Sequence, residues 1–204
     1  MAIQPTSAGG AGQFVEFRLS RFIECDQDER RCITFGSMAI EIEVRVTARL
    51  RLRRPTMDDV KSIVAIDSDP RTNLHRPGGA PSPDQNVQTF CEFILGWEEH
   101  GVGYWTVEFG GDVIGMAGVE PQLFLERECW NLYYRFSPSA WGNGFAVEAA
   151  KEAKIVDSSL QPKWPVVART RATNHAAART AENAGLRRCP ELDTNGFQVF
   201  ALGW

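Results

Sequence analysis

The stretch YYRFSPSAWGNGFAVEAA, residues 133–150, decides the fold because it predicts a strand, a tight glycine turn and a helix in succession. Apolar and polar residues alternate as far as Phe136, which is the period of a β-strand. Pro138 lacks the N–H that a sheet requires, so the strand should end near it. Gly142 and Gly144 follow, and an alanine-rich helical run begins at about Ala146.

A glycine turn that opens a helix is suited to binding an anion. The first N–H groups of a helix have no acceptor inside it, and they lie at the positive end of the helix dipole. Gly142 and Gly144 let this backbone approach a phosphate closely. The stretch therefore predicts a phosphate-bearing ligand.

Two common nucleotide-binding loops do not fit these residues. Neither Gly142 nor Gly144 leads to the Lys-Ser/Thr pair of a Walker loop. The dinucleotide fingerprint requires a third Gly or Ala at the position where this chain has Val147. The phosphate-bearing ligand is therefore not expected to be bound by either of these two nucleotide-binding loops.

The composition is that of a globular protein with one domain and an extension. The chain has 204 residues, of which 43% are hydrophobic and 24% charged, so a sizeable core can form. Its net charge of −4 argues against a nucleic-acid or anionic-membrane partner, and no apolar run approaches the ~18 residues of a membrane span. The five cysteines are scattered and the three histidines isolated, so we expect a cytoplasmic protein without a metal.

The rest of the chain predicts further strands and helices. Residues 1–37 are expected to form an N-terminal extension, partly disordered, and residues 38–204 one domain. Alternation over residues 40–53 predicts a long amphipathic strand, or two in succession. The other expected elements are helices that start after Thr56 and Ser82, a hairpin at 103–119, a loop at Pro121–Arg127, a strand at 163–172, a helix at 174–184 and a last strand at 196–202. This order predicts an α/β or α+β sheet with helices on its faces.

The glycine turn also resembles a known motif. Residues 141–146, WGNGFA, resemble motif A of the GNAT superfamily of acetyl-CoA-dependent N-acetyltransferases. The wider stretch WGNGFAVEA is similar to the Trp-Gly-x-Gly-Tyr-Ala-x-Glu-Ala of the RimJ/RimL-like branch, which acetylates ribosomal-protein N-termini. Further matching pieces extend the resemblance over about residues 49–186: Leu50–Pro55, Ser68–Pro70, Tyr104–Trp105 and Asn174–Leu186.

The resemblance implies a fold and a co-substrate. The fold is a central mixed, mostly antiparallel sheet flanked by helices, and the co-substrate is acetyl-CoA. The family binds the pyrophosphate on the amides of the glycine turn, and pantetheine lies along the end of the preceding strand. Carried over to this chain, the CoA contacts are Arg135, Phe136, Ser137, Trp141, Gly142, Asn143, Gly144, Phe145, Ala146, Val147 and Asn174.

The proton chemistry has several candidates. The attacking amine must be neutral, and a carboxylate can take its proton; Glu120 is the first choice for this base and Glu128 the second. The resemblance implies a Ser or Tyr near the CoA sulfur as acid. The branch commonly has a Ser three residues after the helix-starting Asn, where this chain has Ala177, and no Tyr lies in that helix. Ser137 and Thr180 carry hydroxyls but match no family position.

The predicted function is transfer of an acetyl group from acetyl-CoA to a primary amine, either a protein N-terminus or a small molecule. The acceptor pocket is expected between the first two helices, residues 67–83 and the Pro121–Arg127 loop. The absent hydroxyl at Ala177 leaves open a non-catalytic CoA-binding or regulatory protein, and a nucleotide-binding module is a third class. The N-terminal strand could also pair with a second copy in a homodimer.

Overall fold

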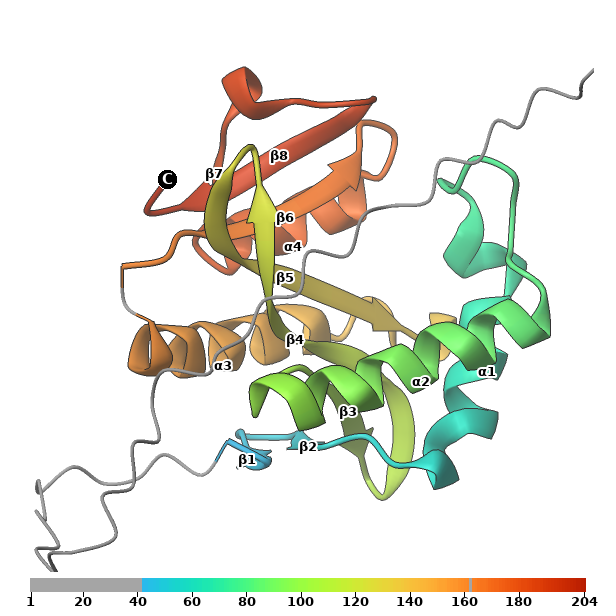
Figure 1. Cartoon of the computed structure of the whole chain (residues 1–204). Helices are drawn as coiled ribbons and strands as arrows, with labels where there is room; N and C mark the ends of the chain where they lie inside the picture. Colours follow the sequence, from blue (N-terminus) through green and yellow to red (C-terminus); the bar gives the residue numbers. More distant parts are fainter. Residues whose placement is uncertain (1–41, 162) are drawn as a thin grey trace, which may run out of the picture. The chain divides into compact units, whose positions relative to one another are not determined.

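The computed structural model describes residues 42–161 and 163–204 (Figure 1). The predicted extension at residues 1–37 and its boundary with the domain lie outside these residues, so the division at residue 38 stays a prediction.

The described strands form one mixed sheet. Its strand order is β1-β2-β3-β4-β5-β6-β8-β7. The strands are β1 (Val44–Val46), β2 (Arg51–Arg53), β3 (Tyr104–Phe109), β4 (Asp112–Phe124), β5 (Arg127–Phe136), β6 (Val166–Arg171), β7 (Arg187–Arg188) and β8 (Phe197–Leu202). Neighbouring strands pair antiparallel except β5 and β6, which are parallel. The predicted mixed, mostly antiparallel sheet is confirmed.

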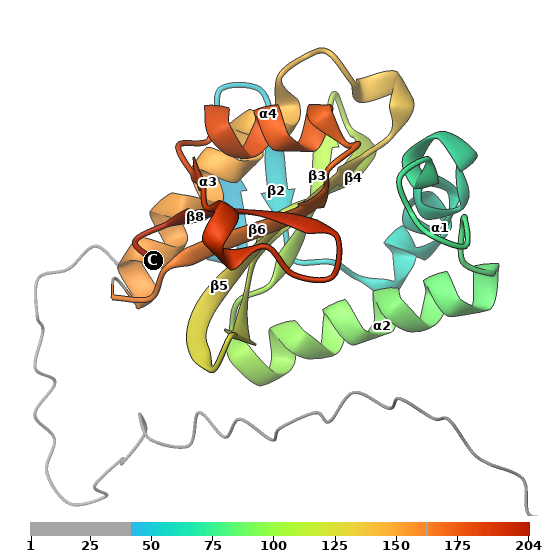
Figure 2. The same cartoon turned by 90° about the horizontal axis from the view of Figure 1, so that it is seen from above.

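Helices cover both faces of this sheet (Figure 2). They are α1 (Val60–Ser68), α2 (Pro83–His100), α3 (Phe145–Leu160) and α4 (His175–Asn183). Short 3₁₀ turns are η1 (Met57–Asp59), η2 (Pro70–Asn73), η3 (Pro138–Ala140) and η4 (Pro190–Leu192). Helices α1 and α2 lie on one face, and α3 and α4 on the other (Figures 1 and 2).

Strand alternation explains which helices cover which face, because successive side chains of a strand point to opposite sides. Trp105 and Leu132 belong to the buried cluster that includes the alanines of α3, whose small side chains let the helix lie close to the sheet. Tyr104 and Met116 instead pack with Phe90 and with α1. The site described below lies between these two layers.

The predicted helix ends are confirmed for α2. The Ser82 hydroxyl accepts from the Gln85 amide at 3.2 Å, and the Gln85 side chain accepts from the Ser82 amide at 3.0 Å, so the capping box is complete. Gly101 closes the helix with a φ of 66°, a conformation that favours glycine. The 40–53 pattern is two strands, β1 and β2, with Val44 opposite Arg53.

The predicted loop at Pro121–Arg127 is wrong. β4 continues to Phe124 and β5 begins at Arg127, so only Leu125 and Glu126 connect them, with φ values of 47° and 62°. Pro121 is tolerated because it lies beyond the last β3–β4 pair, Tyr104 with Gly118, where β4 has β5 as its remaining neighbour. The short strand β7 was also not predicted.

Candidate active site

The central feature of the site is the opening between β5 and β6. The two strands pair only through Trp130 with Val166 and Asn131 with Val167. Beyond Asn131, β5 continues to Phe136 and β6 to Arg171 without pairing to each other, and their arrows diverge in Figure 1. The facing strand edges therefore offer backbone N–H and C=O groups to an extended ligand lying in the opening. We call the point at Asn131 the fork.

The glycine turn lies at the wide end of this opening. Gly142 and Gly144 have φ values of 80° and 75°, which explains why glycine stands at both positions. The first helical bond of α3 runs from the Glu148 amide to the Gly144 carbonyl at 3.1 Å. Among the described residues, the N–H groups of residues 142–147 consequently have no acceptor. The sequence predicts an anion site at these amides, and their lack of acceptors leaves them available for one.

The turn between β1 and β2 holds the glycine turn in place. Arg49 donates to the Asn143 carbonyl at 2.9 Å and to the Glu148 carboxylate at 2.8 Å, and its guanidinium lies 4.6 Å from the centre of the Phe145 ring. Thr47 also donates to Glu148. Partial burial raises the pKa of Glu148, but the hydrogen bonds from Thr47 and Arg49 outweigh it and lower the pKa. Glu148 is thus an ionised structural anchor.

We expect Arg49→Ala to weaken CoA binding about 3- to 10-fold, because Asn143 and Glu148 lose the donor that fixes the turn. The pair is partly exposed, so the free energy of unfolding should fall by only about 1 kcal/mol. Isothermal titration with CoA and thermal unfolding measure the two effects. Arg51→Ala is the matched control, because Arg51 pairs with Glu108 at 2.7 Å away from the turn; equal losses in both variants would contradict the assignment.

The predicted CoA contacts around β5 would act through main chain. The Arg135 guanidinium lies 3.5 Å from Asp67 and the Phe136 side chain is buried, so neither is free for a ligand. The indole N–H of Trp141 donates to the Phe136 carbonyl at 2.9 Å, which anchors the loop, although half of the ring is exposed. Asn143 donates to Ala140 and Trp141 within the turn.

Asn174 follows the end of β6 and Ser137 follows the end of β5, so in these parallel strands both lie on the side of the opening away from the fork. Asn174 caps α4, where its side-chain oxygen accepts from the Ala177 amide at 3.1 Å; its amide NH₂ has no acceptor among the described residues. The Ser137 hydroxyl lies 2.8 Å from that of Ser139, at the glycine-turn end of β5. At ~3.3 Å per residue this is roughly 20 Å along the strand from the fork. Ser137 therefore lies at the glycine-turn end of the site.

Glu120 lies at the fork, directly across the β4–β5 ladder from Asn131. Its carboxylate fits against α2 because Gly96 has no side chain: a Cβ there would be 2.8 Å from a carboxylate oxygen. Burial raises the pKa of Glu120, and the nearby Tyr104 hydroxyl lowers it in part. A partly buried carboxylate with a raised pKa is a suitable general base.

The surroundings of Glu120, which include Tyr104, differ from those of the second candidate base, Glu128. The Tyr104 hydroxyl accepts from the Asn131 side chain at 2.7 Å, and burial raises the pKa of Tyr104 well above its usual value, so the phenol stays protonated beside Glu120. Glu128 lies opposite Leu123 near the β4–β5 turn, and alternation places it on the other face of the sheet from Glu120. The structure brings Glu120, and not Glu128, to the fork.

Tyr134 is a candidate that the sequence analysis assigned only to the apolar side of a strand. Its hydroxyl donates to the Ala177 carbonyl at 2.7 Å, so the side chain reaches from β5 to the first turn of α4. Burial raises the pKa of Tyr134, which keeps the phenol protonated. A strand residue thus supplies a hydroxyl beside Ala177, where the helix itself has none. The signal in the sequence was a tyrosine among otherwise apolar residues.

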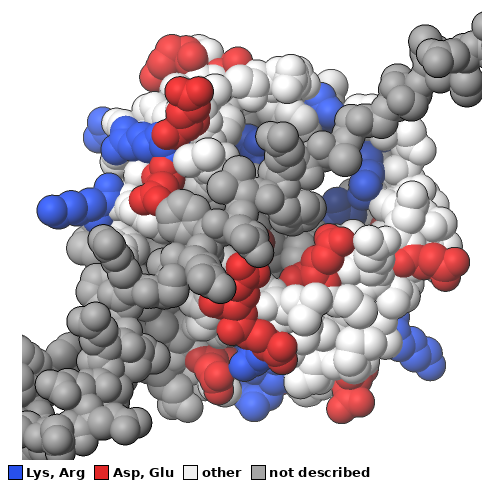
Figure 3. Space-filling model, viewed as in Figure 1, with Lys and Arg blue, Asp and Glu red and all other residues white. Residues whose placement is uncertain are grey.

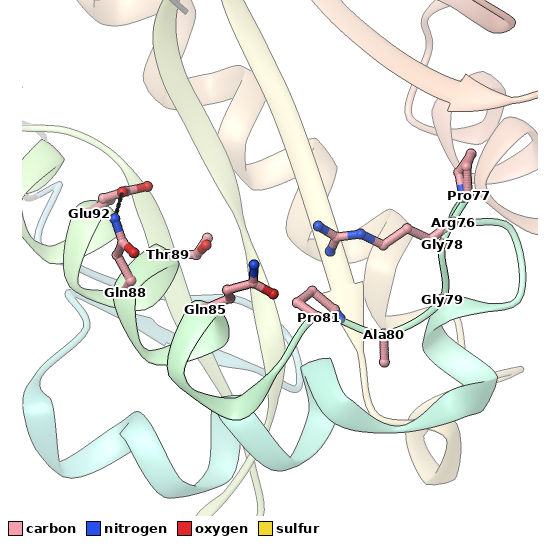
Figure 4. Close-up of a pocket in the computed structure, with 10 residues that line it drawn as sticks. All are labelled: Arg76, Pro77, Gly78, Gly79, Ala80, Pro81, Gln85, Gln88, Thr89 and Glu92. Atoms are coloured by element: carbon pink, nitrogen blue, oxygen red, sulfur yellow. Dashed lines mark hydrogen bonds between the residues drawn. The ribbon is translucent and has the colours of Figure 1, made fainter. Parts of the chain in front are cut away.

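A cavity of about 430 Å³ lies beside α2 (Figure 4). It is lined by loop residues 76–81 and by one face of α2, namely Gln85, Gln88, Thr89 and Glu92. The predicted acceptor pocket included both of these segments. The other two predicted contributors, the first helix and residues 121–127, do not line this cavity.

Comparison with known proteins identifies the family. The protein-family model for the acetyltransferase (GNAT) domain matches residues 49–187, which is well over half of the chain. The chain belongs to the GNAT acetyltransferase family. The glycine turn, the fork and α4 all lie within the matched GNAT region.

Solved structures share the GNAT fold. An acetyltransferase from Agrobacterium tumefaciens str. C58 is 24% identical, with a TM-score of 0.69 over 81% of this chain and 97% of that one. RimL, a ribosomal L7/L12 alpha-N-protein acetyltransferase in complex with CoA, is 15% identical, with a TM-score of 0.62 over 78% of this chain and 97% of that one. Among curated proteins, the uncharacterized protein YkkB of Bacillus subtilis (strain 168) is 29% identical over 43% of this chain. The match spans about half of that relative, 52%.

Two negative findings concern residues 42–161 and 163–204. No helix there is long and apolar enough to cross a membrane. The same residues contain no group of three or more His, Cys, Asp and Glu that could hold a metal ion.

Proposed function

We propose that this GNAT protein transfers an acetyl group from acetyl-CoA to the primary amine of an acceptor. The observation that carries the proposal is the opening between β5 and β6, which ends at amides without acceptors in residues 142–147. The amides would hold the pyrophosphate, and pantetheine would pair with the free edge of β5 along Arg135–Ser137 and toward the fork. The thioester would then lie near Asn131.

The proposed reaction is direct attack. The amine nitrogen forms a bond to the thioester carbon, which gives a tetrahedral oxyanion that a main-chain N–H of β5 stabilises. The carbon–sulfur bond then breaks, the amide product forms and CoA leaves as a thiolate. Glu120 takes the proton of the amine at the fork, and the thiolate receives a proton as it leaves.

We further propose that Tyr134 donates a hydrogen bond to the leaving thiolate. Its hydroxyl is protonated and lies between β5 and α4, and it would turn from the Ala177 carbonyl toward the sulfur. Tyr134 is preferred to the candidate hydroxyl of Ser137, which lies at the proposed phosphate end. Water would then complete the protonation of the thiolate.

Tyr134→Phe should lower kcat about 10-fold or more, because a hydrogen bond to a charged group contributes about 1.5–3 kcal/mol. The ring and its packing are retained, so the CoA dissociation constant and the KM for acetyl-CoA should stay within about 2-fold. Steady-state kinetics with titration of CoA separate the two quantities. An unchanged kcat would mean that the thiolate needs no protein donor.

The acceptor is proposed to be a protein N-terminus or a small-molecule amine, and the reaction needs no metal. Free Cys91, Cys129 and Cys189 agree with the proposed reducing, cytoplasmic location. A homodimer through the N-terminal strand remains a prediction.

A second candidate is a CoA-binding protein without turnover, which the absence of a hydroxyl at Ala177 favours. Titration with CoA, followed by thiol release with a panel of free-amine peptides and small amines, decides between the two. Turnover on any acceptor supports the enzyme, and CoA binding without turnover supports the binding protein. Greater thermal stabilisation by ATP or NAD than by acetyl-CoA would contradict both and favour a nucleotide-binding module.

A further inference from the structure

The cavity beside α2 has an unusual distribution of charge. Gln85, Gln88, Thr89 and Glu92 recur at helical spacing, so one polar face of α2 forms a whole wall of it. The opposite wall is the loop at residues 76–81, and Figure 4 shows the Arg76 guanidinium extending from this loop toward α2. The volume of about 430 Å³ is sufficient for a ligand the size of one or two amino-acid residues.

The Arg76 guanidinium makes no hydrogen bond and no ion pair with the residues that the structure describes, and its charge acts on Asp67 only at longer range. Asp67 is already paired with Arg135 at 3.5 Å. Arg71, in the preceding turn η2, pairs with Asp69 at 2.6 Å. The preceding residue ties this end of the loop to the start of α4, because the His75 ring lies 2.9 Å from the Thr173 hydroxyl, next to the residue that caps α4. An arginine guanidinium beside a cavity is suited to bidentate binding of a carboxylate.

A negative charge, that of Glu92, lies at the end of the cavity away from Arg76. Glu92 lines it and accepts from Gln88 at 3.3 Å. Glu92 lies one helical turn before Gly96, against which the Glu120 carboxylate packs, so this end of the cavity approaches the fork. Acidic side chains predominate in the region of α2 in Figure 3. This end attracts the amine of an acceptor, and seven helical residues, or roughly 10 Å, separate Gln85 from Glu92.

We propose that the acceptor carries a carboxylate in addition to its reacting amine, and that Arg76 binds this carboxylate while the amine lies at the Glu92 and Glu120 end. The proposal rests on acetyl transfer as the function and names the acceptor class. A peptide with an acidic residue next to its N-terminus and a small amino acid both have this chemistry. A polyamine has only cationic groups. It would place a second positive charge beside Arg76, so it is disfavoured as the acceptor.

The test compares acceptors that differ only in this carboxylate. One arm uses the C-terminally amidated peptides Ser-Asp-Ala-Ala and Ser-Asn-Ala-Ala, and the other uses 4-aminobutyrate and its amide. We expect the carboxylate member of at least one pair to have a KM at least 10-fold lower than its amide. Arg76→Ala should remove this difference, and Arg76→Lys should retain part of it. The arm that responds identifies the peptide or the small molecule as the source.

Arg71→Ala is the matched control, since Arg71 lies in the neighbouring turn η2 and does not line the cavity; the acceptor preference of this variant should equal that of the wild type. Turnover that shows no carboxylate preference, or a preference unaffected by Arg76→Ala, overturns the inference and leaves acetyl transfer intact. If no acceptor is turned over, acetyl transfer itself fails. Titration of the same four probes into CoA-loaded wild type and Arg76→Ala then decides whether Arg76 selects carboxylates.

Discussion

Glu120→Gln is expected to lower kcat/KM by about 10²- to 10³-fold, which is the range for loss of a general base. The substitution keeps the shape of the side chain beside Gly96 but removes its ability to take the amine proton. CoA does not contact Glu120 in the proposed arrangement, so the CoA dissociation constant should stay within about 2-fold. Steady-state kinetics and isothermal titration measure the two.

The pH profile gives an independent test of the same residue. Because burial raises the pKa of Glu120, kcat/KM of the wild type should rise with pH through an apparent pKa above the ordinary glutamate range. This ascending limb should disappear in Glu120→Gln. Glu128→Gln is the matched control and should retain nearly full activity, since Glu128 lies near the β4–β5 turn. A large loss in Glu128→Gln alone would transfer the role of base to that residue.

Stability measurements test whether lost activity in Glu120→Gln is caused by unfolding. The folded protein holds the Glu120 proton more tightly than the unfolded chain, so the contribution of this group to stability falls as pH rises from the unfolded to the folded pKa. Glu120→Gln removes this dependence. Its free energy of unfolding at neutral pH should therefore equal or exceed that of the wild type, and a marked decrease would mean that lost activity reflects lost structure.

Gly142→Val is expected to raise the CoA dissociation constant at least 30-fold, about 2 kcal/mol. A Cβ at Gly142 would meet no described atom within 4 Å, so the space beside it is open and is the space that the proposed phosphate needs. The φ of 80° adds backbone strain of about 1–2 kcal/mol for any L side chain. CoA titration and thermal unfolding separate the effect on the ligand from the effect on the fold.

Gly111→Val provides the comparison for Gly142→Val. Gly111 has a φ of 93° in the β3–β4 turn and likewise has no described atom within 4 Å of a built Cβ. Both variants should lose similar stability, but only Gly142→Val should lose CoA affinity. Equal CoA affinities in the two variants would show that the glycine turn does not hold the phosphates.

Much of the fold follows from local sequence patterns. Alternation in residues 130–136 identifies β5, the capping box at Ser82 and the glycine at position 101 bound α2, and Gly142 with Gly144 predict the anion site. Each of these signals is local, because it depends on residues within one turn or one strand. The Pro121–Arg127 error has the same origin. A proline predicts a break from its own chemistry, but whether a strand can tolerate it depends on which neighbour it pairs with.

The sequence by itself determined the glycine turn, most of the order of the elements and the family resemblance. Each of these depends on short stretches of residues that are contiguous in the chain. Only the tertiary structure decided which side chains meet. It brings Glu120 rather than Glu128 to the fork, places the Tyr134 hydroxyl beside Ala177 and places Arg76 at the edge of a cavity without a hydrogen bond to a described residue. The register of β4 on β5 and the point where β5 and β6 part fix these positions, and such pairings join residues far apart in the chain, which no local pattern records.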